Sequence, residues 1–270
     1  MRGIEGRVVA ITGGGSGMGR AIALDLASLG AKVAVCGRRA EPITETVRLV
    51  EEAGGTALAV PCDVRKPEEV DIFLDRVGER FGHADTLINN AAGNFVAPAL
   101  GISPNGWRAV VDIVLNGTFY CSRAFALRFP EAARDTGSIL SVIATYAWTG
   151  NPGTAHSAAA KAGVWSLMKT LAVELAPLGL RANCLAPGIT LTEGAAANLF
   201  PTDEIRDQML ARIPAGRFTE LADIVAAARF LVSDDAALVT GDTLTLDGGY
   251  RLEQGMFRAG GDAAAGRRQG

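Results

Sequence analysis

The side chains with the clearest chemical potential lie between residues 141 and 163, where the sequence reads SVIATYAWTGNPGTAHSAAAKAG. Lys161 follows Ser157 by four residues and Tyr146 by fifteen. A tyrosine four residues before a lysine is typical of hydride transfer, with the tyrosine as proton donor. Here a serine holds that position, which indicates a displaced acid. Lys161 stands within the apolar helical segment AAAKAGV, and because burying a charge costs free energy we assign it a functional role.

A glycine-rich turn precedes the first helical pattern of the chain. Residues 12–19 read TGGGSGMG, directly after the apolar run RVVAI. Glycines in this place bring backbone N–H groups to a pyrophosphate and leave the helix N-terminus facing the anion. The turn therefore predicts a dinucleotide site, with a merely structural turn as the alternative. Its predicted contacts are Gly13, Ser16, Gly17, Met18 and Gly19.

The second strand indicates which dinucleotide binds. An acidic residue at its end would accept from the ribose 2′-hydroxyl of NAD, but the strand KVAVC is followed, after one glycine, by Arg38 and Arg39. Guanidinium groups there suit a 2′-phosphate, so we expect NADPH in preference to NADH, with a solvated basic turn as the alternative. Asp63 and Val64 are expected at the adenine edge, although Asp63 could instead cap the helix that begins near Pro67.

Apolar runs alternate with helical patterns along most of the chain. Strands are expected at RVVAITG, KVAVCG, ALAVPCDV, TLINNAAG, GSILSVIA and RANCLAP, and residues 106–129 and 157–178 are each expected as one helix. Strands this apolar indicate an α/β fold with a single doubly wound parallel sheet, a Rossmann fold, and helices on both faces. One domain is expected over residues 1–258, with a substrate lid at about 190–217 and a disordered tail at 259–270.

Composition limits the functions that remain. The 270 residues carry 26 Lys and Arg against 29 Asp and Glu, without a basic cluster, so no nucleic-acid partner is expected. No apolar run approaches the ~18 residues of a membrane span, so no membrane association is expected and a cytoplasmic location is the default. The four cysteines lack metal-ligand spacing, which predicts reduced core thiols and no metal site.

Together these motifs resemble the short-chain dehydrogenase/reductase family. Besides the glycine turn, the chain carries the NNA stretch at 89–91, Asn116, Lys161 and Pro187-Gly188. Within the family it looks like the 2,4-dienoyl-CoA reductases, through NNAAGNF, DIVLNGTF and the upstream tyrosine. The resemblance runs from about Arg7 to Phe257. It departs from the wider family where Ser157 and Ala144 stand at the usual tyrosine and serine positions, which disfavours simple ketone reduction.

The resemblance implies hydride transfer from NADPH to C5 of a dienoyl-CoA, giving a 3-enoyl-CoA in unsaturated fatty acid degradation. The longer electrophile accounts for the displaced tyrosine, because negative charge develops on an oxygen several bonds from the hydride acceptor. By matching positions, Tyr146 and Asn94 would hydrogen-bond the thioester oxygen. Ser157 and Lys161 would complete the catalytic group, with Asn116 supporting Lys161, which would also hold the nicotinamide ribose. The remaining implied cofactor contacts are Asn90, Ala91, Pro187, Gly188 and Ile189.

Each catalytic assignment has a structural alternative. Tyr146 could be a packing aromatic and Asn94 a turn residue. Ser157 could be the N-cap of the helix that carries Lys161. His156 could polarise a neighbouring hydroxyl, although packing or solvent exposure is expected. An acyl channel would be lined by Trp148, Phe95, Phe119, Leu199, Phe200 and Met209.

Two rival functions stay open. One is an NADPH-dependent reductase of another enone, enoyl thioester or carbonyl compound in specialised metabolism. The other is a non-catalytic protein that binds NADPH and turns nothing over. An acyl-CoA substrate would need basic contacts for its phosphates, for which Arg206, Arg212 and Arg217 are candidates. The resemblance further implies a homotetramer that pairs the helices at about 107–129 and 157–175.

Overall fold

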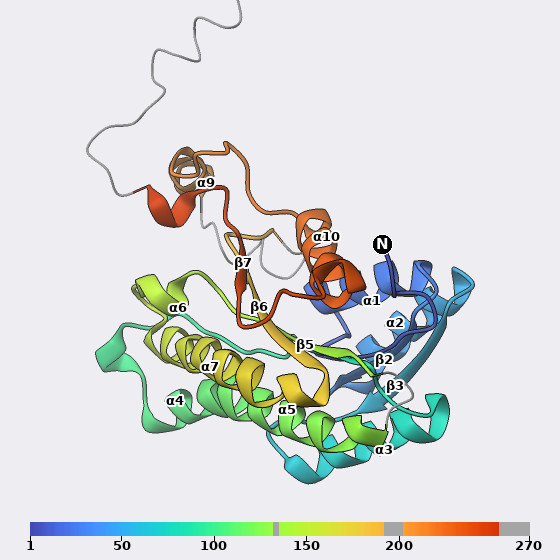
Figure 1. The fold of residues 1–270 in the computed structure, drawn as a ribbon. Helices are drawn as coiled ribbons and strands as arrows, with labels where there is room; N and C mark the ends of the chain where they lie inside the picture. The colour runs from blue at the N-terminus through green and yellow to red at the C-terminus, as the bar shows by residue number, and fades with distance from the viewer. Residues whose placement is uncertain (132–134, 192–201, 254–270) are drawn as a thin grey trace, which may run out of the picture.

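Seven parallel strands form one sheet in the order β3-β2-β1-β4-β5-β6-β7 (Figure 1). The computed structural model describes residues 1–131, 135–191 and 202–253. The strands are β1 (Val8–Thr12), β2 (Lys32–Gly37), β3 (Thr56–Pro61), β4 (Thr86–Asn89), β5 (Gly137–Val142), β6 (Leu180–Pro187) and β7 (Thr243–Leu246). The predicted doubly wound parallel sheet is confirmed, and β7 is a strand that the sequence analysis missed.

Helices cover both faces of the sheet (Figure 1). One face carries α3 (Pro67–Phe81), α4 (Pro104–Val111), α5 (Gly117–Arg128) and α7 (Ala155–Glu174). The other carries α1 (Gly17–Ser28), α2 (Ala40–Glu52) and α10 (Leu221–Val232). The short helices α6 (Tyr146–Thr149) and α9 (Asp203–Ala211) follow the carboxyl ends of β5 and β6, the end at which doubly wound sheets bind their ligands.

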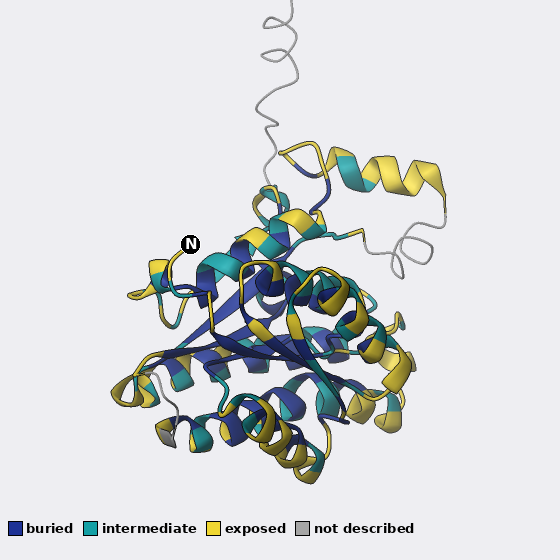
Figure 2. Ribbon diagram, turned by 90° about the vertical axis from the view of Figure 1, so that its right-hand side faces the viewer, coloured by how far each residue is buried: buried dark blue, intermediate teal, exposed yellow. Residues whose placement is uncertain are grey.

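The sheet separates two hydrophobic cores, and alternate residues of a strand serve them. In β1, Val8 and Ala10 belong to the core under α3, α5 and α7, whereas Val9 and Ile11 belong to the core under α1 and α10. All four side chains are buried, and Figure 2 shows the strands as the buried centre of the molecule. Each larger aliphatic side chain buried in this way contributes about 1.5–3 kcal/mol to folding. The two-sided core explains why the strand sequences are apolar without interruption.

The stretch Pro104–Arg128 covers most of the helix predicted at 106–129, but a π-helical turn at Asp112–Asn116 separates α4 from α5. Its most apolar window has a mean hydropathy of 1.2, so by length and composition alone the stretch would suffice to cross a membrane, contrary to the sequence expectation. Half of that window is buried, with Val110, Val114 and Phe125 in the core. Packing against the sheet accounts for the apolar composition.

The helix that carries Lys161 begins at Ala155, with Thr154 as its N-cap. The interpretation of Ser157 as an N-cap is therefore wrong, because Ser157 is the third residue of the helix. Of the predicted lid, α9 is described and is largely exposed (Figure 2). Residues 192–201 and the predicted tail lie outside the described residues, and the domain boundaries stay predictions.

Candidate active site

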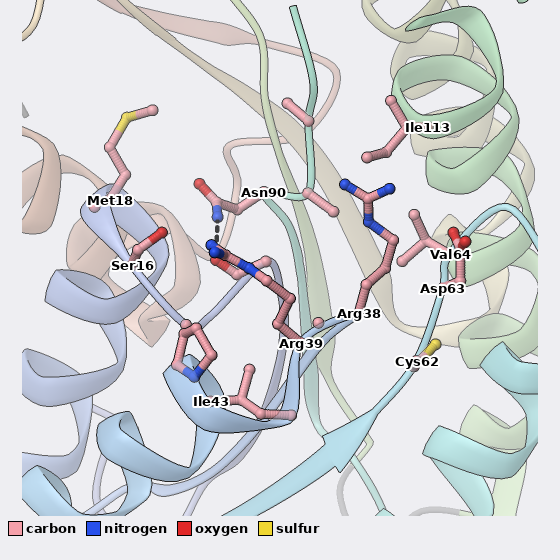
Figure 3. A pocket seen from close by; sticks show the side chains of 17 residues that line it. Ser16, Met18, Arg38, Arg39, Ile43, Cys62, Asp63, Val64, Asn90 and Ile113 are labelled. Carbon is pink, nitrogen blue, oxygen red and sulfur yellow. Dashed lines mark hydrogen bonds between the residues drawn. The ribbon is translucent and has the colours of Figure 1, made fainter. Parts of the chain in front are cut away.

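A cleft of about 320 Å³ opens at the carboxyl ends of β1 to β4 (Figure 3). It lies where the strand order reverses between β1 and β4, the usual ligand position in such sheets. Its lining includes most of the predicted cofactor residues, namely Gly13, Ser16, Gly17, Met18, Arg38, Arg39, Asp63, Val64, Asn90 and Ala91. Ile43, Cys62 and Ile113 also line it and were not predicted, because nothing distinguishes them in sequence from core aliphatic residues and thiols.

The glycine turn presents the N-terminus of α1 to this cleft. Gly13 and Gly17 have φ angles of +65° and +51°, which residues with a side chain rarely adopt. Ser16 is the N-cap of α1, and its side chain caps none of the first N–H groups. A Cβ on Gly19 would lie 2.4 Å from the carbonyl oxygen of Gly13, so this glycine packs behind the turn and permits its close approach to the helix. The free N–H groups at the helix start suit an anion.

Thr12 ties the turn to β4, a role that the sequence analysis missed. Its buried Oγ1 accepts hydrogen bonds from the backbone N–H of Asn90 (3.1 Å) and of Ala91 (3.0 Å). The side-chain amide of Asn90 donates in turn to the carbonyl oxygen of Thr12 and to that of Gly13, the second bond being drawn in Figure 3. Asn90 therefore holds the shape of the glycine turn as well as lining the cleft.

Two guanidinium groups stand at the rim of the cleft. Arg38 and Arg39 are exposed and make no hydrogen bond or ion pair within the described part of the chain. Figure 3 shows Arg38 near Asp63 and Val64, whereas Arg39 extends on the side of Ser16. The pair concentrates positive charge at the end of β2.

Asp63 does not cap the next helix, because Arg65 binds its carboxylate. The guanidinium Nε of Arg65 lies 2.9 Å from Oδ1 and Nη2 lies 2.5 Å from Oδ2. These hydrogen bonds lower the pKa of the Asp63 carboxyl group. Lys66 is the N-cap of α3, so the capping alternative for Asp63 is wrong, and the residue stays ionised at the wall of the cleft.

The hydroxyl groups of Tyr146 and Ser157 are hydrogen bonded at 3.2 Å, between α6 and α7. One turn farther along α7, the buried ammonium group of Lys161 donates to the carbonyl oxygen of Val142, 2.5 Å away at the end of β5. Burial lowers the pKa of Lys161 to about 8. The structure therefore brings together three of the predicted catalytic residues at the end of the sheet.

The two predicted catalytic asparagines lie on different elements. Asn116 ends the π-helical turn and donates from Nδ2 to Oδ1 of Asp112, 2.8 Å away. No direct hydrogen bond joins Asn116 to Lys161 in the described part of the chain. Asn94 is exposed on the loop after β4 and makes no side-chain hydrogen bond within the same residues. Its amide is free for a ligand, and its predicted role stays a prediction.

Pro187, Gly188 and Ile189 lead out of β6 beside β7. The Gly188 N–H donates to the carbonyl oxygen of Leu246 (2.8 Å), and Ile189 accepts from the Thr219 N–H (3.0 Å). A Cβ on Gly188 would lie 2.7 Å from Cα of Asp247, so only glycine fits there. These three residues do not line the cleft at the glycine turn. They lie at the carboxyl end of β6, the strand next to β5. Val142, at the end of β5, accepts the hydrogen bond from Lys161.

The residues considered for an acyl channel and for CoA differ in their surroundings. His156 is fully buried against Phe95, which confirms that it packs. Trp148 packs near Trp165, with 5.8 Å between ring centroids, and Phe119 is exposed. Leu199 and Phe200 lie outside the described residues, and Met209 is half-buried on α9. Of the basic candidates, Arg217 is paired with Asp223, Arg212 stacks on Tyr250, and Arg206 is exposed.

Comparisons with known proteins agree over nearly the whole chain. A family model described as enoyl-(acyl carrier protein) reductase matches residues 13–251. A Bacillus subtilis protein named probable 2,4-dienoyl-CoA reductase, (2E)-enoyl-CoA-producing, is 44% identical over 94% of this chain and 100% of its own length. The Saccharomyces cerevisiae peroxisomal 2,4-dienoyl-CoA reductase, (3E)-enoyl-CoA-producing, is 38% identical over 91% and 84%. A crystal structure of gluconate 5-dehydrogenase from Burkholderia cenocepacia with NADP and tartrate superposes with a TM-score of 0.85, at 32% identity, over 91% and 95%.

Proposed function

Because this chain belongs to the short-chain dehydrogenase/reductase family and is an oxidoreductase of that type, we propose that it is an NADPH-dependent 2,4-dienoyl-CoA reductase. The observation that carries the proposal is the hydrogen bond between Tyr146 and Ser157, 3.2 Å long, next to the buried Lys161. A serine hydroxyl replaces the acid of a simple carbonyl reductase, while the tyrosine hydroxyl approaches from a different helix. Two relatives whose names include 2,4-dienoyl-CoA reductase support this substrate class.

The residues of the cleft fit a dinucleotide. The uncapped start of α1 offers N–H groups to a pyrophosphate, and Gly19 keeps clear the space that a Cβ would fill. Asp63 and Val64 bound the adenine end of the cleft. When bound, the nicotinamide supplies the hydride. Lys161 holds the nicotinamide ribose from the end of β5, where its ammonium group is already fixed by Val142.

Arg38 and Arg39 select NADPH. Both guanidinium groups are exposed at the end of β2, and neither forms a hydrogen bond or ion pair with an acidic residue within the described part of the chain, while the charge of Arg38 contributes to the lowered pKa of Asp63. A ribose 2′-phosphate is a dianion, and charge-assisted hydrogen bonds to arginine contribute about 1.5–3 kcal/mol each. No acidic residue stands at the end of β2 to accept from a 2′-hydroxyl. NADH consequently lacks the contact that distinguishes the two cofactors.

Tyr146 and Asn94 stabilise the charge that develops on the thioester oxygen. The Tyr146 hydroxyl is positioned by Ser157, and the Asn94 amide is free on the exposed loop after β4. Hydrogen-bond donors aimed at such an oxygen accelerate a reaction because they need no reorganisation as charge appears. Lys161, with a pKa of about 8, is mostly charged at neutral pH and adds to the positive potential of the site.

The position of the final proton decides which product forms. Hydride added at C5 leaves negative charge on C2, C4 and the thioester oxygen. Protonation at C2 gives a 3-enoyl-CoA, whereas protonation at C4 gives a 2-enoyl-CoA. We assign the 3-enoyl product, because the proposed role of Tyr146 puts the acid beside the thioester end. The names of the B. subtilis and S. cerevisiae relatives differ in this product, so the double bond must be measured for this chain.

The test follows NADPH oxidation with 2,4-hexadienoyl-CoA, beside acetoacetyl-CoA as a ketone substrate and NADH as a cofactor. We expect dienoyl-CoA turnover that prefers NADPH and falls roughly 10²–10⁴-fold in Tyr146→Phe, the loss typical of a removed general acid. Tyr120→Phe is the matched control, because Tyr120 lies on α5 outside the site. Turnover in deuterated water should place deuterium at C2.

Reduction of acetoacetyl-CoA alone, or a Tyr146→Phe variant with full activity, would refute the proposal. The first outcome would favour a carbonyl reductase, the activity class to which gluconate 5-dehydrogenase belongs by its name. Binding of NADPH without turnover of either thioester would favour a non-catalytic role. A homotetramer and a place in unsaturated fatty acid degradation complete the proposal and rest on the family resemblance, and the cytoplasmic location stays a prediction.

A further inference from the structure

His156 is a fully buried imidazole directly beside the proposed catalytic group. It is the second residue of α7, and the next residue, Ser157, bonds the hydroxyl of Tyr146. On its other side the ring meets Phe95 edge to face, with 4.3 Å between centroids and 88° between planes. Phe95 follows Asn94 on the loop after β4. The imidazole therefore contacts the residue that follows Asn94, and it immediately precedes the residue that bonds Tyr146.

One hydrogen bond fixes which nitrogen carries the ring proton. The backbone N–H of Ser157 donates to Nδ1 of His156 at 2.8 Å. This N–H belongs to the first turn of α7 and has no partner within the helix. Because Nδ1 accepts, the proton of the neutral ring is on Nε2, which is then a donor.

The Nε2–H has no hydrogen-bond acceptor among the described residues, although it is buried. Buried donors without acceptors are uncommon because they lose their hydration without compensation. Such a group next to a substrate site is explained if a ligand provides the acceptor. A histidine that served only to cap α7 would need Nδ1 alone.

Phe95 is the side chain that a ligand can displace to reach this donor. Its ring is 42% exposed, and residues 91–98 belong to no helix or strand. The ring packs between His156 and α4, where a Cβ on Gly106 would come within 2.9 Å of the Phe95 Cζ. An apolar acyl chain can replace this contact without leaving apolar surface in water.

We propose that His156 is a substrate-binding residue whose Nε2–H donates a hydrogen bond to the carbonyl oxygen of a conjugated acyl thioester, once the acyl chain has displaced the ring of Phe95. The inference rests on the proposed function and adds a third donor to Tyr146 and Asn94. Several donors suit an oxygen that gains negative charge, because each strengthens as the charge develops. The matching ligand has a carbonyl oxygen next to an apolar, unsaturated chain.

Two substitutions separate the role of Nε2–H as a donor to the substrate from the role of Nδ1 as the acceptor for the Ser157 N–H. His156→Asn retains an acceptor at the position of Nδ1 and removes the Nε2–H. His156→Gln places an N–H near the position of Nε2 and removes the acceptor for Ser157. We expect the asparagine variant to melt like the wild type while kcat/KM for 2,4-hexadienoyl-CoA falls roughly 10²-fold, as for other lost oxyanion donors. The glutamine variant should retain most of the activity and melt at a lower temperature.

A spectroscopic readout reports the hydrogen bond itself. With oxidised cofactor, 2,4-hexadienoyl-CoA binds without turnover, and polarisation of its carbonyl group shifts the dienoyl absorption band to longer wavelength. The shift should shrink in His156→Asn and persist in His156→Gln. In the wild-type protein, which has only two histidines, the Nε2–H signal in a nitrogen-15 NMR spectrum should move when this ligand is added. That measurement needs no variant to fold.

Three results would overturn the inference. Wild-type kcat/KM and absorption shift in His156→Asn would show that the Nε2–H serves only the ring of Phe95. An imidazole signal that does not move in the wild-type protein would show the same. If the wild-type protein does not reduce the dienoyl-CoA at all, the proposed function fails and this role fails with it. Turnover by the wild type together with either of the first two results refutes the histidine role alone.

Discussion

Replacing Lys161 with methionine is expected to stabilise the ligand-free protein near neutral pH while abolishing reductase activity. Lys161 is buried on α7, and its ammonium group has one protein partner in the described residues, the carbonyl oxygen of Val142. One hydrogen bond replaces only part of the hydration that an ammonium ion loses on burial. Methionine has a similar length and no charge to desolvate. Under the proposed function, Lys161 is retained to hold the nicotinamide ribose, at a cost in stability.

The lowered pKa of Lys161 gives the magnitude and the sign of the expected change in stability. Burial lowers the pKa of Lys161 from 10.5 to about 8, which corresponds to about 3.4 kcal/mol against the folded charged form. The hydrogen bond to Val142, which methionine cannot form, stabilises the wild type by about 1–2 kcal/mol. The net gain in the free energy of unfolding of Lys161→Met is therefore about 2 kcal/mol. Below pH 8 the lysine is charged in both states, and the full cost is present. As the pH rises from about 8 to 10.5 the folded state releases its proton first, so the cost disappears.

The assay is urea unfolding of the wild type and Lys161→Met at several pH values between 7 and 10.5, without cofactor. The free energy of unfolding of the variant should exceed that of the wild type by about 2 kcal/mol at pH 7. This difference should fall by about 3 kcal/mol between pH 7 and 10.5, so that the wild type becomes the more stable protein above a pH between about 9 and 10. Lys169→Met is the matched control, because Lys169 is exposed on the same helix and lies over the ring of Trp165. A Lys161→Met variant that is less stable than the wild type at pH 7, or a pH-independent difference, would refute the reasoning.

Two further predictions test the cofactor cleft. Gly19→Ala should abolish NADPH binding in a calorimetric titration, because the new Cβ would lie 2.4 Å from the carbonyl oxygen of Gly13. The control Gly78→Ala, whose new Cβ would have no atom within 4 Å, should bind NADPH normally and gain about 0.5–1 kcal/mol of stability. Normal NADPH binding by Gly19→Ala would contradict this account of the turn. Replacing both Arg38 and Arg39 with alanine should raise the KM for NADPH at least tenfold and leave the KM for NADH nearly unchanged, because only NADPH carries the 2′-phosphate. An equal rise in KM for both cofactors would show that the two arginines do not bind the 2′-phosphate.

The fold could be predicted from the sequence because local and global signals agree. The six predicted strands are present, since runs such as VVAIT are apolar at every position and fit a sheet buried on both faces. The strand β7 was missed because TLTL is short and half-buried, and no strongly apolar run marks it. The π-helical turn was missed because it retains a helical pattern of apolar residues. Nothing in DIVLN distinguishes i→i+5 from i→i+4 hydrogen bonding.

Candidate residues marked by their type and spacing could be named from the sequence, whereas residues that act through tertiary contacts could not. Tyr146, Ser157 and Lys161 were recognised together, and their hydroxyl and ammonium groups gather at the end of the sheet. Thr12 was missed because its hydrogen bonds to Asn90 and Ala91 join segments 78 and 79 residues apart. No local pattern encodes such a partner.

Moving the tyrosine from α7 to α6 separates two demands that a simple carbonyl reductase places on one helix. The helix α7 is fixed against the sheet by Ala160, Val164 and Met168, so Lys161 keeps a constant position relative to β5 and the cofactor cleft. The single turn α6 rests on buried Ala147, and it meets α7 through the hydroxyl of Tyr146 and the ring of Trp148. Under the proposed function, the hydroxyl of Tyr146 would therefore reach a more distant oxygen without a change in how Lys161 meets the cofactor.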